Sequence, residues 1–225
     1  GCARAQRAEV PEPYQPEEPI DKKILVVGGG ITGMTAAIEA AKAGSEVILV
    51  EREPQLGGML RRLHKLYPKK PPYRDLEDPD IEARIKEIEA NPKIKVFTGT
   101  EIEKTEGAPG LFDVTLKNGE SFRVGAIVQA TGFKPYDASK LEHLGYGRSP
   151  DVVTNLELEE MAQRGTIVRP SDGKPVQKVA FIQCAGQRDP EHLPYCSAIC
   201  CMTSLKQALY IVEQNPEAEA YIFYK

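Results

Sequence analysis

The segment Lys22–Glu51 reads KKILVVGGGITGMTAAIEAAKAGSEVILVE and sets the architecture of the chain. Its short, β-branched run Ile24–Val27 is typical of a buried parallel strand. Glycines follow at once, and an alanine-rich stretch after them predicts a helix that ends at Gly44. A second apolar run, Glu46–Val50, predicts the next strand. The segment is therefore expected to be a strand–loop–helix–strand unit of a parallel α/β sheet.

Gly28, Gly30 and Gly33 have the G-x-G-x-x-G spacing of dinucleotide-binding loops. The first glycine allows a tight turn, the second lets backbone approach a pyrophosphate, and the third permits close helix–strand packing. Free N–H groups at the helix start can hold the phosphates. Glu51, eighteen residues after Gly33, can accept hydrogen bonds from an adenosine ribose. A glycine-rich turn without a nucleotide is the alternative, but strand, loop, helix and acid together favour a dinucleotide site.

Two further glycines, Gly57 and Gly58, follow the ribose acid in an E-x-x-x-x-x-G-G arrangement. Glycine there lets backbone run close to a ligand. The arrangement resembles FAD-binding flavoproteins of the thioredoxin reductase-like group, and an ordinary surface turn is the alternative. The sequence Ala130-Thr131-Gly132, at the end of an expected strand over 126–130, also resembles that group.

The rest of the first part extends the same unit. The pattern predicts a helix over 80–90 and a third parallel strand over 93–97. Strands over 100–105, 111–117 and 120–124, with the hairpin signal Asn118-Gly119, predict an antiparallel layer. We therefore expect a Rossmann-like FAD-binding domain over 22–175, with an antiparallel three-stranded crossover.

A short helix over 156–163 and a polar, turn-rich segment over 164–178 mark the end of this domain. A strand over 179–182, a helix over 197–214 and a strand over 220–224 then predict a partial second βαβ unit, 176–225. This unit stops after its second strand, and the chain begins with Gly-Cys, so we expect a fragment of a longer protein. Residues 1–21 are proline-rich and predict a linker, in which Cys2 stands alone.

Composition excludes several classes of function. The net charge of −4 and the absence of a basic run argue against a nucleic-acid surface. No run approaches the roughly 18 apolar residues of a membrane helix, and no secretory leader is visible, so a cytoplasmic location is expected. Four of the five cysteines lie between 184 and 201, which indicates metal or redox use more than a disulfide framework.

The cysteine segment occupies the place where a second Rossmann unit would have its phosphate loop. Gly186 is the only glycine there, so this unit lacks the glycine pattern expected for nicotinamide dinucleotide binding. On the expected helix, Cys196 and Cys200 share one face, Cys201 lies next to it, and Cys184 comes from the strand end. Four thiolates at a helix N-terminus, where the dipole lowers thiol pKa values, fit a [4Fe–4S] cluster.

Other interpretations remain open. Four sulfurs could hold zinc, although adjacent cysteine ligands are unusual for zinc knuckles. A redox disulfide is possible, but no C-x-x-C motif is present. Cys201 alone would fit a buried stripe with Leu205, Ala208 and Val212. His192 could tune a cluster, though a surface or packing role is more common for an isolated histidine.

The string FIQCAGQRDPEHLPYCSAICCMTSLKQAL resembles the A subunits of heterodisulfide reductases and their relatives in the quinone-interacting membrane-bound oxidoreductase complex. The resemblance implies a thioredoxin reductase-like fold, one FAD and a [4Fe–4S] cluster. The archaeal A subunits have an additional cysteine-bearing stretch and a ferredoxin-like insertion that this chain lacks. It is therefore closer to the second flavoprotein subunit, or B subunit, of the quinone-interacting complex.

The resemblance implies electron transfer between FAD, a cluster and partner subunits, peripheral to the inner membrane. An FAD- and NAD(P)H-dependent disulfide reductase using Cys200 or Cys201, and a non-catalytic partner-binding scaffold, are the alternatives. The expected cluster ligands are Cys184, Cys196, Cys200 and Cys201. The expected FAD-binding residues are Gly28, Gly30, Ile31, Thr32, Gly33, Glu51, Arg52, Gly57, Gly58, Met59, Ile102, Ala130, Thr131 and Gly132.

Overall fold

A parallel sheet forms the centre of the first part of the molecule. The computed structural model describes residues 18–68 and 70–224, so most of the predicted linker and Cys2 lie outside the described residues. The sheet has the order β3-β2-β1-β7, with β1 at Ile24–Val27, β2 at Val47–Val50, β3 at Ile94–Phe97 and β7 at Ala126–Gln129. Every neighbouring pair is parallel, as the sequence predicts.

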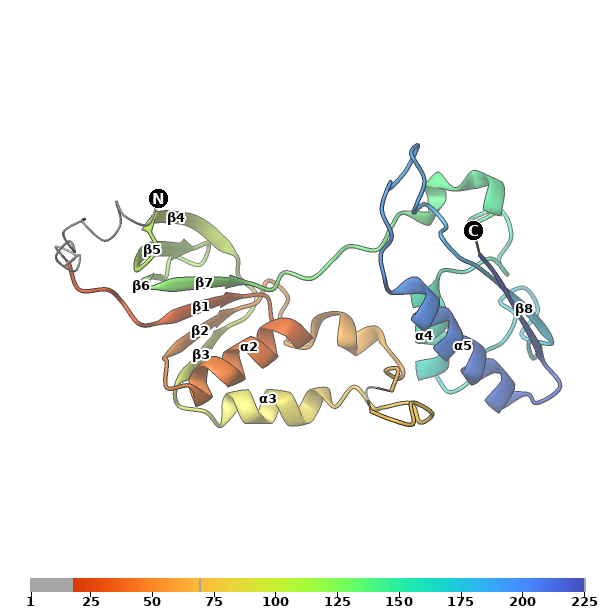
Figure 1. Cartoon of the computed structure of the whole chain (residues 1–225), viewed down its shortest axis with the longest axis horizontal. Helices are drawn as coiled ribbons and strands as arrows, with labels where there is room; N and C mark the ends of the chain where they lie inside the picture. Colours follow the sequence, from red (N-terminus) through yellow and green to blue (C-terminus); the bar gives the residue numbers. More distant parts are fainter. Residues whose placement is uncertain (1–17, 69, 225) are drawn as a thin grey trace, which may run out of the picture.

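Two helices cover one face of this sheet (Figure 1). They are α2, Ile31–Lys42, and α3, Ile81–Glu89. Val26 and Leu49 point into the core beneath them, together with Met34 of α2 and Ile88 of α3. The small residues Ala37 and Ala41 let α2 lie close to the strands.

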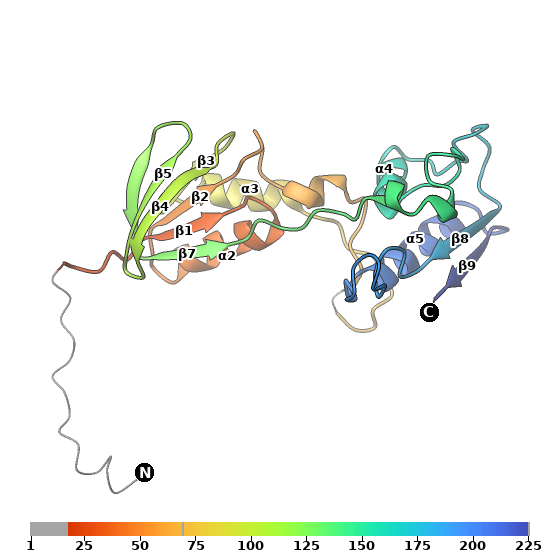
Figure 2. The same ribbon diagram turned by 90° about the horizontal axis from the view of Figure 1, so that it is seen from above.

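An antiparallel sheet covers the other face (Figure 2). Its order is β4-β5-β6, with β4 at Ile102–Ala108, β5 at Leu111–Leu116 and β6 at Ser121–Val124. Leu25, Ile48 and Val50 alternate with the residues that face the helices and pack against Val114 and Leu116. This arrangement confirms the expected Rossmann-like fold with an antiparallel crossover.

An extended segment after β7 leads to a second group of elements (Figure 1). Two short 3₁₀ helices, Ala138–Lys140 and Glu142–Leu144, come first, and α4 follows at Asn155–Gln163. The predicted βαβ unit is then formed by β8, Lys178–Ile182, α5, Cys200–Gln214, and β9, Glu219–Phe223. β8 and β9 are parallel neighbours.

The core of this second group is shared by α4, α5 and the strands. Leu158 and Ala162 of α4 pack with Phe181 of β8 and with Tyr210 and Ile211 of α5. The chain therefore begins to contribute to this core before residue 175. The boundary expected at 175 stays a prediction.

Candidate functional sites

The two glycine motifs of the first part meet at the carboxyl ends of β1 and β2. The Gly57 N–H donates to the Gly29 carbonyl at 2.8 Å. A Cβ on Gly58 would lie 3.1 Å from the Gly30 Cα. Segment 57–62 begins with Gly57 in a left-handed conformation and continues as a short 3₁₀ helix, Gly58–Arg62. Two backbone loops thus form one surface at the sheet edge where doubly wound folds bind their ligands.

The fingerprint glycines have different steric surroundings. A Cβ on Gly28, whose φ is +108°, would lie 2.3 Å from the Ala130 oxygen, and a Cβ on Gly33 would lie 1.7 Å from the Gly28 oxygen. Both positions therefore need glycine for the fold itself. Gly30 has an ordinary φ of −77° and no atom within 4 Å of an added Cβ. No protein atom therefore explains why position 30 is glycine. The missing side chain instead leaves room for a phosphate to approach the backbone closely.

Glu51 lies beneath this loop and is buried. Its Oε2 accepts from the Gly29 N–H at 2.5 Å, and its Oε1 accepts from the Glu53 N–H at 2.8 Å. The carboxylate therefore holds the glycine loop against the end of β2. A carboxylate has about four lone-pair sites, so both oxygens can accept further hydrogen bonds from a ribose.

The other expected FAD residues are distributed around the same edge. Thr32 is exposed on the first turn of α2, and Thr131 and Gly132 are exposed just after β7. Ile31 packs against the core under α2, and Ala130 is part of it. Arg52 is exposed and pairs with Glu53, while Met59 is half-buried. Ile102 instead packs between the two sheets.

The donor set around the loop fits the diphosphate and ribose of a dinucleotide. The first turn of α2 has no side-chain cap, because Gly30 is its N-cap residue, and backbone N–H groups are therefore available there. Thr100 Oγ1 is buried without a hydrogen-bond partner, and the Thr100 N–H donates to the Glu51 carbonyl. An unpartnered hydroxyl therefore lies beside the expected ribose position.

A second candidate site is the irregular loop that connects β8 to α5. Cys184, Arg188 and Ala198 all have φ between 52° and 58°, the left-handed region that non-glycine residues avoid. Strained backbone of this kind is typical of functional loops. The Arg188 N–H donates to the Tyr195 carbonyl, and the Asp189 N–H donates to the Leu193 carbonyl, each at 3.0 Å. These backbone bonds fold the loop back on itself as an ordered, compact structure.

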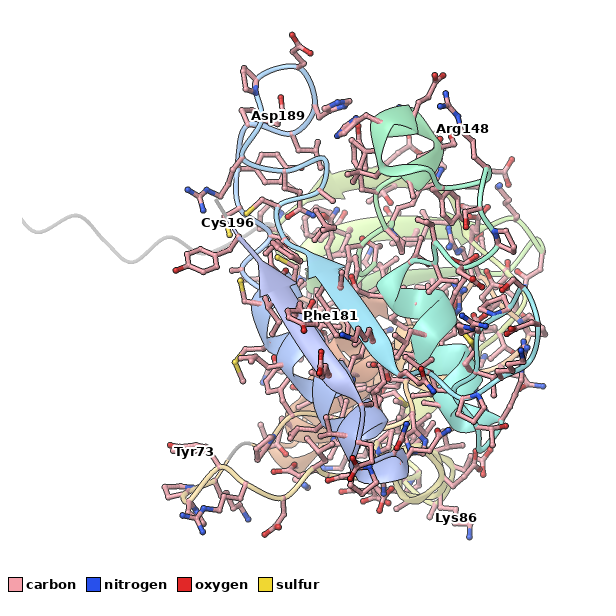
Figure 3. All side chains as sticks on the ribbon, turned by 90° about the vertical axis from the view of Figure 1, so that its right-hand side faces the viewer. Tyr73, Lys86, Arg148, Phe181, Asp189 and Cys196 are labelled. Atoms are coloured by element: carbon pink, nitrogen blue, oxygen red, sulfur yellow. The ribbon has the colours of Figure 1, made fainter. Side chains whose placement is uncertain are left out.

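The cysteines of this loop lie at one end of the second unit. Figure 3 shows the labelled Cys196 with further sulfur atoms nearby. The neighbouring Cys200 raises the pKa of the Cys201 thiol, and the charges of Cys184 and Cys196 act in the same direction. The expected lowering of the pKa at the helix start is therefore wrong for Cys201. Four thiolates in one region repel one another, and bound cationic iron would relieve that repulsion.

Two details of the predicted cysteine geometry are wrong. The helix begins at Cys200, not at 197, so Cys196 lies in the loop and does not share a helical face with Cys200. Ala198, with its left-handed φ, separates them. Cys201 is exposed, and so is Leu205, so they do not form a buried stripe.

The donor set of this loop is four free cysteines, two half-buried and two exposed. Among the described residues, no three His, Cys, Asp or Glu side chains are close enough to hold a metal ion. Each thiolate of a cluster binds a different iron, so cluster ligands stand farther apart than the ligands of one ion. Gln183 Nε2 and Ser197 Oγ, each adjacent in sequence to one of the cysteines, are buried without partners. The composition of the site fits a cysteine-held iron–sulfur group.

Gly186 has a packing role in this loop. Its φ is +70°, and an added Cβ would lie 2.5 Å from the Tyr136 ring. The Tyr136 hydroxyl lies 2.6 Å from His192 Nδ1, so the histidine connects the loop to the segment after β7. The glycine is therefore explained by the aromatic ring, and no phosphate is needed to account for it.

The basic segment after Gly58 contacts the protein itself. Arg62 pairs with Glu160 of α4, and Lys65 pairs with Asp78. Sequence reasoning missed the buried partner of this segment, Glu159, whose Oε2 accepts from the His64 N–H at 2.9 Å. An acidic residue in a polar helix gives no sequence signal of burial.

Comparison with known proteins identifies related chains. The first of two iron-sulfur A subunits of CoB–CoM heterodisulfide reductase in Methanopyrus kandleri is 29% identical over 298 residues, covering 92% of this chain and 44% of its own length. The iron-sulfur A subunit of the same enzyme in Methanocaldococcus jannaschii is 29% identical, and the match covers 91% of this chain and 44% of the relative. The chain thus spans less than half the length of these curated relatives. The alignments are longer than this chain, so the relatives contain inserted segments.

Solved structures overlap only in part. A thioredoxin reductase of Bacillus anthracis has a TM-score of 0.38 and 20% identity, covering 50% of this chain and 36% of its own. L-Proline dehydrogenase of P. horikoshii has a TM-score of 0.45 and 16% identity, and the match covers 94% of this chain and 37% of the dehydrogenase.

Within residues 18–68 and 70–224, no helix has the length and apolarity needed to cross a membrane.

The family model described as pyridine nucleotide-disulphide oxidoreductase matches residues 2–159, which is more than half of the chain. The matched region contains both glycine motifs and the complete parallel sheet. The chain belongs to the pyridine nucleotide-disulphide oxidoreductase family.

Proposed function

We propose that this chain is an electron-transfer flavoprotein unit of a heterodisulfide reductase-like complex, with FAD at the glycine loops and a [4Fe–4S] cluster held by Cys184, Cys196, Cys200 and Cys201. The observation that carries the proposal is the combination of a dinucleotide cradle with four free cysteines on a strained loop of the second unit. The family implies the FAD. The relatives, which are iron-sulfur A subunits by name, support the cluster and the partner subunits.

FAD exchanges electrons in pairs or singly, and an iron–sulfur cluster exchanges them one at a time. The protein residues supply position and electrostatics. Backbone N–H groups at the start of α2 would hold the diphosphate, and Gly30 would let it approach. Glu51 would orient the ribose while it holds the glycine loop in place. Cys184 and Cys196 from the loop, with Cys200 and Cys201 from α5, would enclose the cluster.

Nicotinamide chemistry at the second unit is not supported. Its phosphate-loop position contains the cysteine loop, whose single glycine faces Tyr136. Partners of a redox complex are therefore the expected electron donors and acceptors. We include in the proposal a cytoplasmic location and attachment to the inner membrane through those partners, as in the quinone-interacting complexes that the sequence resembles.

A disulfide reductase that uses the Cys200 and Cys201 thiols is a second candidate. The two residues are adjacent at the start of α5, and the neighbouring Cys200 raises the pKa of the Cys201 thiol, so two thiols lie near each other without metal. A disulfide between adjacent residues on a helix is strained, however, and this geometry disfavours it. The two functions differ in their metal content, which makes them separable by experiment.

The test is cofactor analysis of the full chain after anaerobic reconstitution with FAD, iron and sulfide. We expect one FAD and about four iron atoms per chain. Gly30→Ala should abolish FAD binding while iron content and folding are kept, because the added methyl group contacts no protein atom. Cys196→Ala should remove the iron and keep the FAD. Yellow, iron-free wild-type protein with two thiols that titrate on reduction would establish the disulfide reductase instead.

A further inference from the structure

Three buried side-chain polar atoms have no hydrogen-bond partner in the described part of the chain: Thr100 Oγ1, Gln183 Nε2 and Ser197 Oγ. Leaving such a group unpaired is unfavourable, so proteins rarely retain one without a use. Thr100 belongs to the dinucleotide side, next to Glu51. The other two directly precede Cys184 and directly follow Cys196. All three therefore fall at the proposed cofactor sites.

Gln183 faces the helix that carries two of the cysteines. Its N–H donates to the Phe223 carbonyl at 2.8 Å, so the pairing of β8 with β9 extends to this residue. Side chains alternate along a strand, and Gln183 thus shares the face of Phe181, which packs against α5 (Figure 3). Because β8 and β9 are parallel, the helix between them runs back against the strand direction, and its first turn, with Cys200 and Cys201, belongs to the carboxyl end of β8. The Gln183 residue is 6% exposed.

Ser197 lies in the last part of the loop, just before α5. Its N–H donates to Gln187 Oε1 at 3.0 Å, which fixes the backbone between Cys196 and Ala198. The Ala198 N–H donates to Cys196 Sγ at 3.3 Å, so one backbone donor already reaches a cysteine sulfur in this segment. The Ser197 hydroxyl is a further buried donor there.

We propose that Gln183 and Ser197 are hydrogen-bond donors to the sulfur atoms of the cysteine-held group, and that Gln183 sets its reduction potential. The inference rests on the proposed cluster and adds the residues that tune it. A cluster gains negative charge when it is reduced, and a buried N–H donor stabilises the reduced form more than the oxidised form. Burial strengthens this effect, because no water competes for the donor.

A competing explanation is that a water molecule accepts the hydrogen bond of the Gln183 side-chain amide. Gln183 also lines a pocket of about 280 Å³, together with His143, Cys184 and Phe223. A water molecule there could accept from the amide, and the group would then have no influence on the cysteines. The two explanations predict different electrochemistry.

The experiment is a dye-mediated anaerobic redox titration of the full chain reconstituted with iron and sulfide, followed by absorbance and electron paramagnetic resonance. Gln183→Leu should retain its iron. Its equilibrium constant for one-electron reduction should be about tenfold lower than that of the wild type, which corresponds to a reduction potential about 59 mV more negative. Ser197→Ala should shift the potential in the same direction. Gln177→Leu is the matched control, since Gln177 is exposed just before the other end of β8.

The outcomes separate the two proposals. Full iron content with an unchanged potential in both Gln183→Leu and Ser197→Ala would overturn this inference and leave the cluster intact. Iron-free wild-type protein would overturn both. If Gln183→Leu does not fold, Gln183→Met, which keeps the length of the side chain, and Ser197→Ala provide the same measurement.

Discussion

Lys206 Nζ lies 2.9 Å from Glu159 Oε1, and the two side chains are 4% and 1% exposed. This ion pair joins α5 to α4 in the interior of the second unit. The same ammonium donates to the Lys65 carbonyl at 2.5 Å, and Gln207 Nε2 donates to Glu159 Oε1 at 2.8 Å. The pair therefore also binds the segment that follows Gly58. One buried network thus connects the segment after Gly58, at Lys65, with the helix that carries Cys200 and Cys201.

Lys206→Met should destabilise the chain by about 3–5 kcal/mol, because it leaves the Glu159 carboxylate buried without its charge partner. Urea unfolding followed by circular dichroism measures this change. The double variant Lys206→Met with Glu159→Gln should recover much of the loss, since the uncompensated charge is gone and an acceptor oxygen remains for the Gln207 amide. If the double variant is as unstable as the sum of the single variants, the ion pair is not the reason for the loss.

Tyr210 predicts an alkaline limit to stability. Burial raises the pKa of its phenol well above the usual value, and the nearby Glu159 carboxylate raises it further. The folded protein therefore keeps a proton that the unfolded chain releases above about pH 10. Stability supplied by this residue is complete below that pH and is lost as the pH rises further.

Tyr210→Phe should accordingly flatten the fall of the unfolding free energy between pH 9.5 and 11, roughly the range around the free phenol pKa. Tyr224→Phe is the matched control, because Tyr224 is 83% exposed just after β9. Equal slopes for wild type and Tyr210→Phe would show that the phenol ionises equally in the folded and unfolded states.

Gly33→Ala tests the steric role of the third fingerprint glycine. The added Cβ would lie 1.7 Å from the Gly28 oxygen, so α2 must move away from the loop. We expect a loss of about 1–3 kcal/mol in unfolding free energy together with weaker FAD binding. Gly30→Ala is the comparison and should cost no more than about 1 kcal/mol. Similar unfolding free energies for the two variants would contradict the steric assignment.

Local sequence pattern was sufficient for the first part of the fold. The run Ile24–Val27 and the hairpin signal Asn118-Gly119 depend on near neighbours in the chain, and the strands lie where these signals predict. The second unit was less predictable. Its helix starts at Cys200, because the left-handed Ala198 interrupts a pattern that looks helical from 197. Nothing in the residue types reveals that conformation.

Burial on α5 was the least predictable feature. Leu205 and Leu209 are exposed, whereas Lys206 and Gln207 are buried. The hydrophobic pattern places the leucines inside, but the ion pair with Glu159 and the hydrogen bond from Asn155 to Gln207 turn the polar residues inward. Such partners lie about 50 residues away in the chain, so the helix sequence alone cannot report them.

Gly186→Ala tests whether the cysteine loop needs glycine for packing. The substitution places a Cβ 2.5 Å from the Tyr136 ring. The φ of +70° at this position is also energetically unfavourable for alanine. We expect a loss of about 1–3 kcal/mol and lower iron retention after reconstitution. Adding Tyr136→Leu should restore part of the stability by removing the ring, although it also breaks the hydrogen bond to His192.

The comparison that decides this point is a double-mutant cycle on thermal unfolding, with nicotinamide dinucleotide titrated into each variant. A coupling between Gly186→Ala and Tyr136→Leu, with no dinucleotide affinity in any variant, assigns the glycine to the aromatic contact. Additive effects, together with wild-type dinucleotide binding that Gly186→Ala abolishes, would instead make the loop a phosphate site. In that case the cysteines would have to act beside a bound nicotinamide, because the strand end at which they meet would already hold its diphosphate.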